Sequence, residues 1–234
     1  MTQAASDRPG SGCTHRECAH PERERVFTTA TIITFVRTAI TLGLAFAAAK
    51  DQSLPLLLWA LGTYWVGDSI DGIVARIMDQ ETRTGAALDI MCDRISAAAF
   101  YIGFAWYDPT MAFPVAIYLS EFMVIDLYLS LAFLQWPLVS PNYFYLVDRR
   151  LYLWNWSRAG KTVNSGLFAV YMVIVREPWS AAAIAAGLFA LKAVSMGWMT
   201  KLALPVPVGC LQPDAAEADG SESSATQEDR NSRR

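Results

Sequence analysis

Four aspartates lie in a stretch of this sequence that is otherwise apolar enough to cross a lipid bilayer: Asp68, Asp71, Asp89 and Asp93. An ionised aspartate near the middle of a membrane helix costs about 2.5–3.5 kcal/mol on insertion scales, so acids in such positions mark functional sites. One nearby arginine, Arg76, leaves an excess of negative charge. Carboxylate oxygens in this number are ligands of hard divalent ions, so the sequence predicts a site for Mg²⁺ or Mn²⁺.

The spacing of these acids places them on helix faces that can meet. The first pair is three residues apart and the second pair four apart, so each pair shares one face of its helix. In an antiparallel hairpin of the two helices, the four carboxylates would converge at one depth. The same faces carry Gly72, Ala75 and Gly85, small residues that let a helix or a flat ligand approach closely. The alternative is a set of polar residues that line a water-filled groove without chemistry.

The helices that must position the acids form an all-α membrane domain. The chain has 234 residues, of which 53% are apolar, and the apolar residues cluster in long blocks typical of an integral membrane protein. The second and third blocks carry the acids and should face the interior of a six-helix transmembrane bundle. The six predicted spans are 27–49, 54–78, 84–107, 110–135, 160–176 and 179–203.

The distribution of basic residues predicts the orientation of the bundle. With six spans both termini share one side, and that side carries nearly all the arginines near span ends; the opposite side has only Lys50 and Arg176. The positive-inside rule therefore predicts a multi-pass protein of the cell membrane, with both termini and the metal site on the cytoplasmic side. Residues 1–25 lack the apolar core of a cleavable signal peptide. No basic surface interleaved with aromatics suggests nucleic acid as a partner.

The two ends of the chain are polar. We expect the polar segments 1–25 and 205–234 to be disordered cytoplasmic tails. The six-span domain between them covers 26–204. The first tail holds Cys13, His15, Cys18 and His20, whose thiols and imidazoles form an alternative, a structural zinc site.

The connection at 136–160 combines aromatic and basic side chains, which is typical of a segment at the lipid headgroup level. It either anchors the protein at the membrane surface or binds an anionic acceptor, because arginine matches phosphate geometry. The candidate residues for binding the acceptor are Arg149, Arg150, Arg158 and Lys161.

The fourth span contains two further acids, Glu121 and Asp126. We expect them to form a polar groove wall or to pack through hydrogen bonds.

The pattern D-x2-D-G-x2-A-R-x8-G-x3-D-x3-D at 68–93 resembles the signature of the CDP-alcohol phosphatidyltransferases. The segment Thr31–Arg37 is similar to the start of the family's first helix, which contacts the nucleotide. The run Leu88–Ser96 looks most like the actinobacterial phosphatidylinositol-phosphate synthase branch.

This resemblance implies transfer of a phosphatidyl group from CDP-diacylglycerol to a soluble alcohol, with release of CMP. Inositol 1-phosphate is the favoured acceptor, and glycerol 3-phosphate or another alcohol is the alternative. Two Mg²⁺ or Mn²⁺ ions would be held by Asp68, Asp71, Asp89 and Asp93, and Asp93 would also act as the general base. The CDP-lipid would contact Thr31, Ile32, Ile33, Thr34, Gly72, Ala75, Arg76, Thr82 and Gly85.

Other classes of function stay open at this point. Rings of aspartate also bind ions in cation channels and transporters, but such proteins would not need Gly72, Ala75 or Arg76. A scaffold without activity is a second alternative, which the intact set of acids disfavours. The oligomeric state is open, and a homodimer is one alternative.

Overall fold

The computed structural model describes residues 17–20 and 23–202, and this part of the chain is built from helices. Within it the only extended pairing is an isolated bridge between Cys18 and Leu138. The predicted all-α class is therefore confirmed for these residues. Most of both predicted tails, including Cys13 and His15 of the alternative zinc site, lies outside the described residues.

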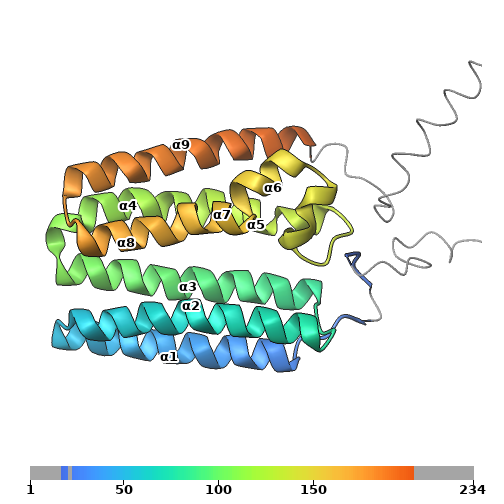
Figure 1. Ribbon diagram of the computed structural model, residues 1–234, viewed down its shortest axis with the longest axis horizontal. Coiled ribbons are helices and arrows are strands. Elements are labelled where there is room, and N and C mark those ends of the chain that lie inside the picture. The colour runs from blue at the N-terminus through green and yellow to red at the C-terminus, as the bar shows by residue number, and fades with distance from the viewer. Residues whose placement is uncertain (1–16, 21–22, 203–234) are drawn as a thin grey trace, which may run out of the picture.

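Long helical segments run alongside one another (Figure 1). Three come first: α1 (Thr29–Asp51), α2 (Leu54–Ile77) and α3 (Arg83–Tyr107). The next segment, Pro109–Gln135, joins η2 (Pro109–Met111), α4 (Ala112–Ser120), η3 (Glu121–Asp126), α5 (Leu127–Leu131) and η4 (Ala132–Gln135). After η5 (Pro141–Leu146) and α6 (Arg149–Asn155), the chain continues through α7 (Arg158–Lys161), η6 (Thr162–Gly166) and α8 (Leu167–Ile174) to α9 (Pro178–Leu202).

Helix boundaries follow from capping residues in the sequence. Thr28 caps α1 by accepting a hydrogen bond from the backbone N–H of Thr31 at 3.1 Å. Thr82 caps α3 in the same way, with the N–H of Gly85 at 3.0 Å. Gln52 ends α1 in the left-handed conformation with φ 49°, so that α2 starts within a few residues and runs back along α1.

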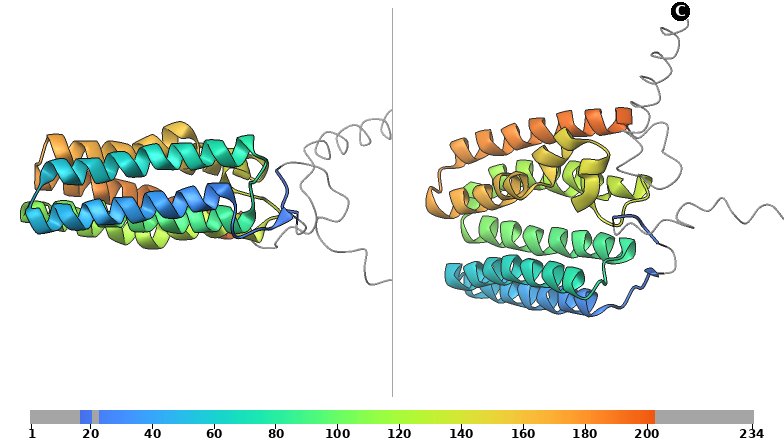
Figure 2. Two further views of the ribbon diagram at one scale, coloured as in Figure 1. Left: turned by 90° about the horizontal axis from the view of Figure 1, so that it is seen from below. Right: turned by 45° about the vertical axis from the view of Figure 1, so that its right-hand side comes forward.

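Three of these segments are long and apolar enough to cross a membrane, by length and composition: α1, Pro109–Gln135 and α9. The α2 and α3 helices have the length but also carry the aspartates. Figures 1 and 2 show the start of α1, the α2–α3 loop, α6 and the end of α9 at one end of the molecule. The turn after α1 and the connection between α8 and α9 lie at the opposite end.

The buried apolar residues form two separate clusters. One is built around Phe100, Phe104 and Tyr118, and the other around Phe133, Phe144 and Met199. Charged residues occupy the level between them: Asp89, Asp93 and Arg94 on α3, Glu121 and Asp126 on η3, and Lys192 on α9. A polar layer thus crosses the inside of the helix assembly, and such a layer requires partners for every buried charge.

Candidate active site

The acids of α2 and α3 meet where the two helices pack against each other. Carboxylate oxygens of Asp68, Asp71 and Asp89 lie within 4.8 Å of one another. Asp71 is buried, with 3% of its side chain exposed, whereas Asp68 is 46% exposed. The fourth acid, Asp93, lies one helical turn further along α3 and is joined to Asp89 through a shared cation.

That cation is Arg37 of α1, which the sequence analysis named only as the end of the segment Thr31–Arg37 and did not place among the acids. Its Nε donates to Asp71 Oδ2 at 2.6 Å, and its Nη2 donates to Asp89 Oδ1 at 2.6 Å and to Asp93 Oδ1 at 2.7 Å. Asp68 Oδ1 lies 3.7 Å from the same Nη2. The signal in the sequence was an arginine in the middle of an apolar span, which requires a buried counter-charge.

The Arg37 side chain is held in this position by close packing on α2. A Cβ placed on Gly67 would lie 2.6 Å from Arg37 Cδ, closer than real Cβ contacts. Gly67 is therefore needed for the guanidinium stem to pass α2. Thr34, one turn earlier on α1, donates its hydroxyl to Asp71 Oδ2 at 2.8 Å.

The chemistry of this donor set fits a divalent cation. Three clustered carboxylates offer only oxygen ligands, which suit Mg²⁺ and Mn²⁺ rather than zinc. Arg37 already contacts Asp71 and Asp89, so a divalent ion would share these oxygens with the guanidinium or displace it. A total of four acids against one arginine still leaves uncompensated negative charge.

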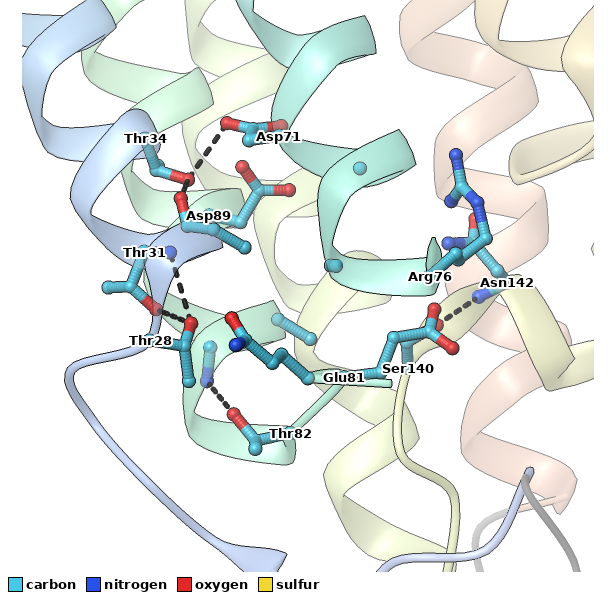
Figure 3. A pocket seen from close by; sticks show the side chains of 16 residues that line it. Thr28, Thr31, Thr34, Asp71, Arg76, Glu81, Thr82, Asp89, Ser140 and Asn142 are labelled. Atoms are coloured by element: carbon cyan, nitrogen blue, oxygen red, sulfur yellow. Dashed lines mark hydrogen bonds between the residues drawn. The ribbon is translucent and has the colours of Figure 1, made fainter. Parts of the chain in front are cut away.

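A pocket opens beside the acids, between α1, α2 and the start of α3 (Figure 3). Figure 3 shows Thr28, Thr31 and Thr34 on one side, with Arg76 and Asn142 across from them. The structure brings together seven of the residues predicted to contact the CDP-lipid. These are Thr31, Thr34, Gly72, Ala75, Arg76, Thr82 and Gly85, and the same pocket is lined by Asp71 and Asp89.

Ile32 and Ile33, the other two residues of that predicted set, lie elsewhere. They line an apolar groove between α1 and α2 together with Val36, Trp59 and Val66. Ile32 is 54% exposed. The helical turn that points Thr31 and Thr34 inward thus turns these isoleucines away from the pocket.

A second cavity of about 170 Å³ also adjoins the acids. Asp68 and Asp93 line it, together with Glu121, Asp126 and Lys161. Its remaining polar lining residues are Tyr64, Arg94, Ser130, Asn155, Asn164 and Lys192, none of which the sequence analysis had assigned to a site. Asp71 and Asp89 thus line the pocket of Figure 3, whereas Asp68 and Asp93 line this second cavity.

Buried ion pairs form one wall of the second cavity. Asp126 pairs with both Arg94 and Lys192, and its Oδ1 lies 2.5 Å from Lys192 Nζ. Arg94 Nη2 also donates to Ser130 Oγ at 2.8 Å, and Lys192 Nζ donates to Asn155 Oδ1 at 2.9 Å. Hydrogen-bonded packing is thus the observed environment of Asp126, as the sequence analysis expected.

Of the four residues predicted to bind the acceptor, one lines the second cavity and three do not. Lys161 lines the second cavity, where its Nζ donates to Asn142 Oδ1 at 3.3 Å. Arg149, Arg150 and Arg158 are exposed and are not among the residues that line either space. The Arg150 guanidinium instead lies 6.0 Å from the Trp198 ring.

Comparison with known proteins identifies the family. Residues 27–199 match the family model described as CDP-alcohol phosphatidyltransferase. The phosphatidylinositol phosphate synthase of Corynebacterium glutamicum is 35% identical over 78 residues, which cover 32% of this chain and 34% of that protein. The chain is thus aligned with only about a third of that relative. No solved structure matches. Because the family model spans the acids, both adjoining spaces and most of the helices, this chain belongs to the CDP-alcohol phosphatidyltransferase family.

Proposed function

We propose that this protein is an integral membrane enzyme of phospholipid synthesis that transfers the phosphatidyl group of CDP-diacylglycerol to a polar alcohol and releases CMP. The observation that carries the proposal is the position of the acid cluster beside two spaces. One is lined by the motif residues expected to bind the CDP-lipid, and the other is a polar cavity that reaches Asp93. Two substrates can thus approach the same group of carboxylates from two separate spaces.

The pocket of Figure 3 suits the nucleotide part of the lipid. Gly72 and Ala75 leave the α2 surface open for a flat base, and Arg76 provides a cation for the diphosphate. Hydroxyl groups of Thr31 and Thr82 line the same pocket and can bond to the sugar or the phosphates. The apolar surface of the surrounding helices would take the acyl chains.

The reaction joins an acceptor hydroxyl oxygen to the phosphorus that carries the lipid. The new P–O bond forms as the P–O bond to CMP breaks, and the hydroxyl proton passes to a base. Asp93 faces the second cavity and has the chemistry of that base. Two divalent ions, Mg²⁺ or Mn²⁺, held by Asp68, Asp71, Asp89 and Asp93, would neutralise the diphosphate and the departing CMP.

For the acceptor we propose inositol 1-phosphate, with glycerol 3-phosphate as the alternative. The Corynebacterium relative is a phosphatidylinositol phosphate synthase, and its match covers a third of this chain. Lys161 at the second cavity supplies an exposed cation for an acceptor phosphate. The two other basic residues of this cavity, Arg94 and Lys192, pair with Asp126.

The proposed setting is a six-span bundle with both termini and the active site on the cytoplasmic side. Three segments have the length and composition of membrane spans, and α2 and α3 have the length of one. Inward-facing acids account for the lower apolarity of α2 and α3.

An acceptor panel tests the proposal. Purified protein in lipid nanodiscs is given CDP-diacylglycerol with and without Mg²⁺, and CMP release is measured with inositol 1-phosphate, glycerol 3-phosphate, inositol or serine. We expect CMP only when both Mg²⁺ and an alcohol are present, and fastest with inositol 1-phosphate. Absence of CMP with every acceptor would refute phosphatidyl transfer, and a faster reaction with another alcohol would refute the choice of acceptor.

A further inference from the structure

Glu121 is a buried acid at the second cavity, and one of its carboxyl oxygens has no hydrogen-bond partner within the described chain. Only 2% of the residue is exposed, and its Oε1 has no hydrogen-bond partner. The side chain lines the cavity that also contains Asp93. A buried carboxyl oxygen without a partner destabilises a fold, and native structures seldom retain one without a reason. A ligand in the cavity would supply the missing donor.

The two basic residues of the wall formed by the buried ion pairs do not donate to this oxygen. Arg94 and Lys192 both pair with Asp126, and they also donate to Ser130 and Asn155. With Glu121 counted, this wall carries as many acids as bases. A phosphate placed against it would meet two carboxylates and two cations that are already paired, so the wall is not built as a phosphate clamp.

The unpaired atoms of the wall are one acceptor and one donor. Besides Glu121 Oε1, the Nε of Arg94 is buried without a hydrogen-bond partner. A hydroxyl can donate to the first and accept from the second, whereas an ammonium group can only donate and a phosphate oxygen can only accept. The two unpaired atoms, Glu121 Oε1 and Arg94 Nε, therefore match the hydroxyl groups of a polyol.

The backbone around the cavity is also irregular on two facing segments. Glu121 begins the π-helix η3 (Glu121–Asp126), and Asn164 lies in a second π-helix, η6 (Thr162–Gly166). Both residues line the cavity. Wide helical turns of this kind occur often at functional sites, where they re-aim side chains. Two such turns line one cavity here, an arrangement typical of a functional site.

We propose that Glu121 determines acceptor specificity by accepting hydrogen bonds from hydroxyl groups of a polyol acceptor that do not react. This inference rests on the proposed function and deepens it. The reacting hydroxyl would face Asp93, the other hydroxyls would face Glu121 and Arg94, and a phosphate on the acceptor would point outward to Lys161. The cavity volume of about 170 Å³ is well above the roughly 10–15 Å³ needed to hold one water molecule, as a small polyol requires.

The test compares Glu121→Gln with the wild type, and Asp51→Asn serves as the control because Asp51 is exposed at the end of α1. Glutamine keeps the shape but replaces one accepting oxygen by a donor. Binding of inositol 1-phosphate is measured by calorimetry on the protein saturated with CDP-diacylglycerol. We expect Glu121→Gln to weaken this binding by about tenfold or more, because the loss of a hydrogen bond to a charged group lowers affinity by about that factor. The CDP-lipid affinity and the control variant should stay at the wild-type values.

A thermal melt separates recognition from a structural role. Without acceptor, Glu121→Gln should melt at or above the wild-type temperature, because it removes an unpaired buried carboxyl. Unchanged acceptor binding would overturn the proposal, and so would a lower melting temperature with equal losses for both substrates. Tighter binding of inositol 1-phosphate would show that its phosphate faces Glu121, which also contradicts the proposal. If the wild type releases no CMP, the proposed function fails, while the binding result still decides the role of Glu121.

Discussion

Replacing Arg37 by methionine should destabilise the protein in the absence of divalent ions. Methionine keeps the apolar stem but removes the guanidinium that contacts Asp71, Asp89 and Asp93 at 2.6–2.7 Å. Only 4% of the Arg37 side chain is exposed, so its loss leaves an uncompensated group of carboxylates inside the helices. Breaking a buried ion pair from one side costs about 3–5 kcal/mol.

The lower end of that range applies here, because Asp89 and Asp93 are 37% and 23% exposed and water can reach them. At about 2–4 °C per kcal/mol for a domain of this size, a loss of about 3 kcal/mol lowers the melting temperature by about 6–12 °C. Divalent ions should reverse much of this loss, since they would neutralise the same carboxylates without competition from the guanidinium.

The assay is a thermal melt of protein in nanodiscs with EDTA or with saturating Mg²⁺, followed by tryptophan fluorescence. Arg150→Met is the matched control, because Arg150 is exposed and lies away from the acids. We expect Arg37→Met to melt well below the wild type in EDTA and to gain more from Mg²⁺ than the wild type does. Equal melting temperatures in EDTA, or an equal gain from Mg²⁺, would refute the role of Arg37 as the counter-charge of the cluster.

Further variants examine the packing of the site. Gly67→Ala should raise the Mg²⁺ concentration needed for half-maximal activity or lower stability, because its methyl group collides with Arg37; wild-type behaviour in both titration and melt would contradict this. Ala75→Leu should weaken CDP-lipid binding at unchanged stability by filling the pocket beside α2, and intact affinity with a lower melting temperature would instead indicate a packing role. Asp126→Asn should lower the free energy of unfolding by about 3–5 kcal/mol, since it removes the carboxylate that pairs with both Arg94 and Lys192, and a melt equal to the wild type would refute this.

The sequence predicted the parts of the site that are local to two helices. Asp68 and Asp71, and then Asp89 and Asp93, have spacings that only need regular helices to share a face. The convergence of three of these acids followed from the short loop between α2 and α3, capped by Thr82. All-helical structure was likewise predictable from long apolar blocks.

The missed residues depend on contacts between distant parts of the chain. Arg37 donates hydrogen bonds to acids 34 to 56 positions away, and Lys192 pairs with Asp126 across the assembly. Each appeared in the sequence as one charge in an apolar span, which signals a buried partner but does not say which one. The π-helical turns at Glu121 and Thr162 were not predictable, because no periodic pattern marks the extra residue of a wide turn.

Transfer of the phosphatidyl group itself can be followed by mass spectrometry of the lipids in parallel with CMP release. Wild-type protein with CDP-diacylglycerol, Mg²⁺ and inositol 1-phosphate should form one phosphodiester lipid for each CMP released. Asp93→Asn should lose about 10²–10⁴-fold of that rate while it retains CDP-lipid binding, because the base is removed and the nucleotide pocket is not. CMP release with phosphatidic acid as the lipid product would mean hydrolysis, and near wild-type transfer by Asp93→Asn would mean that the base is another residue; either result would contradict the mechanism proposed for this site.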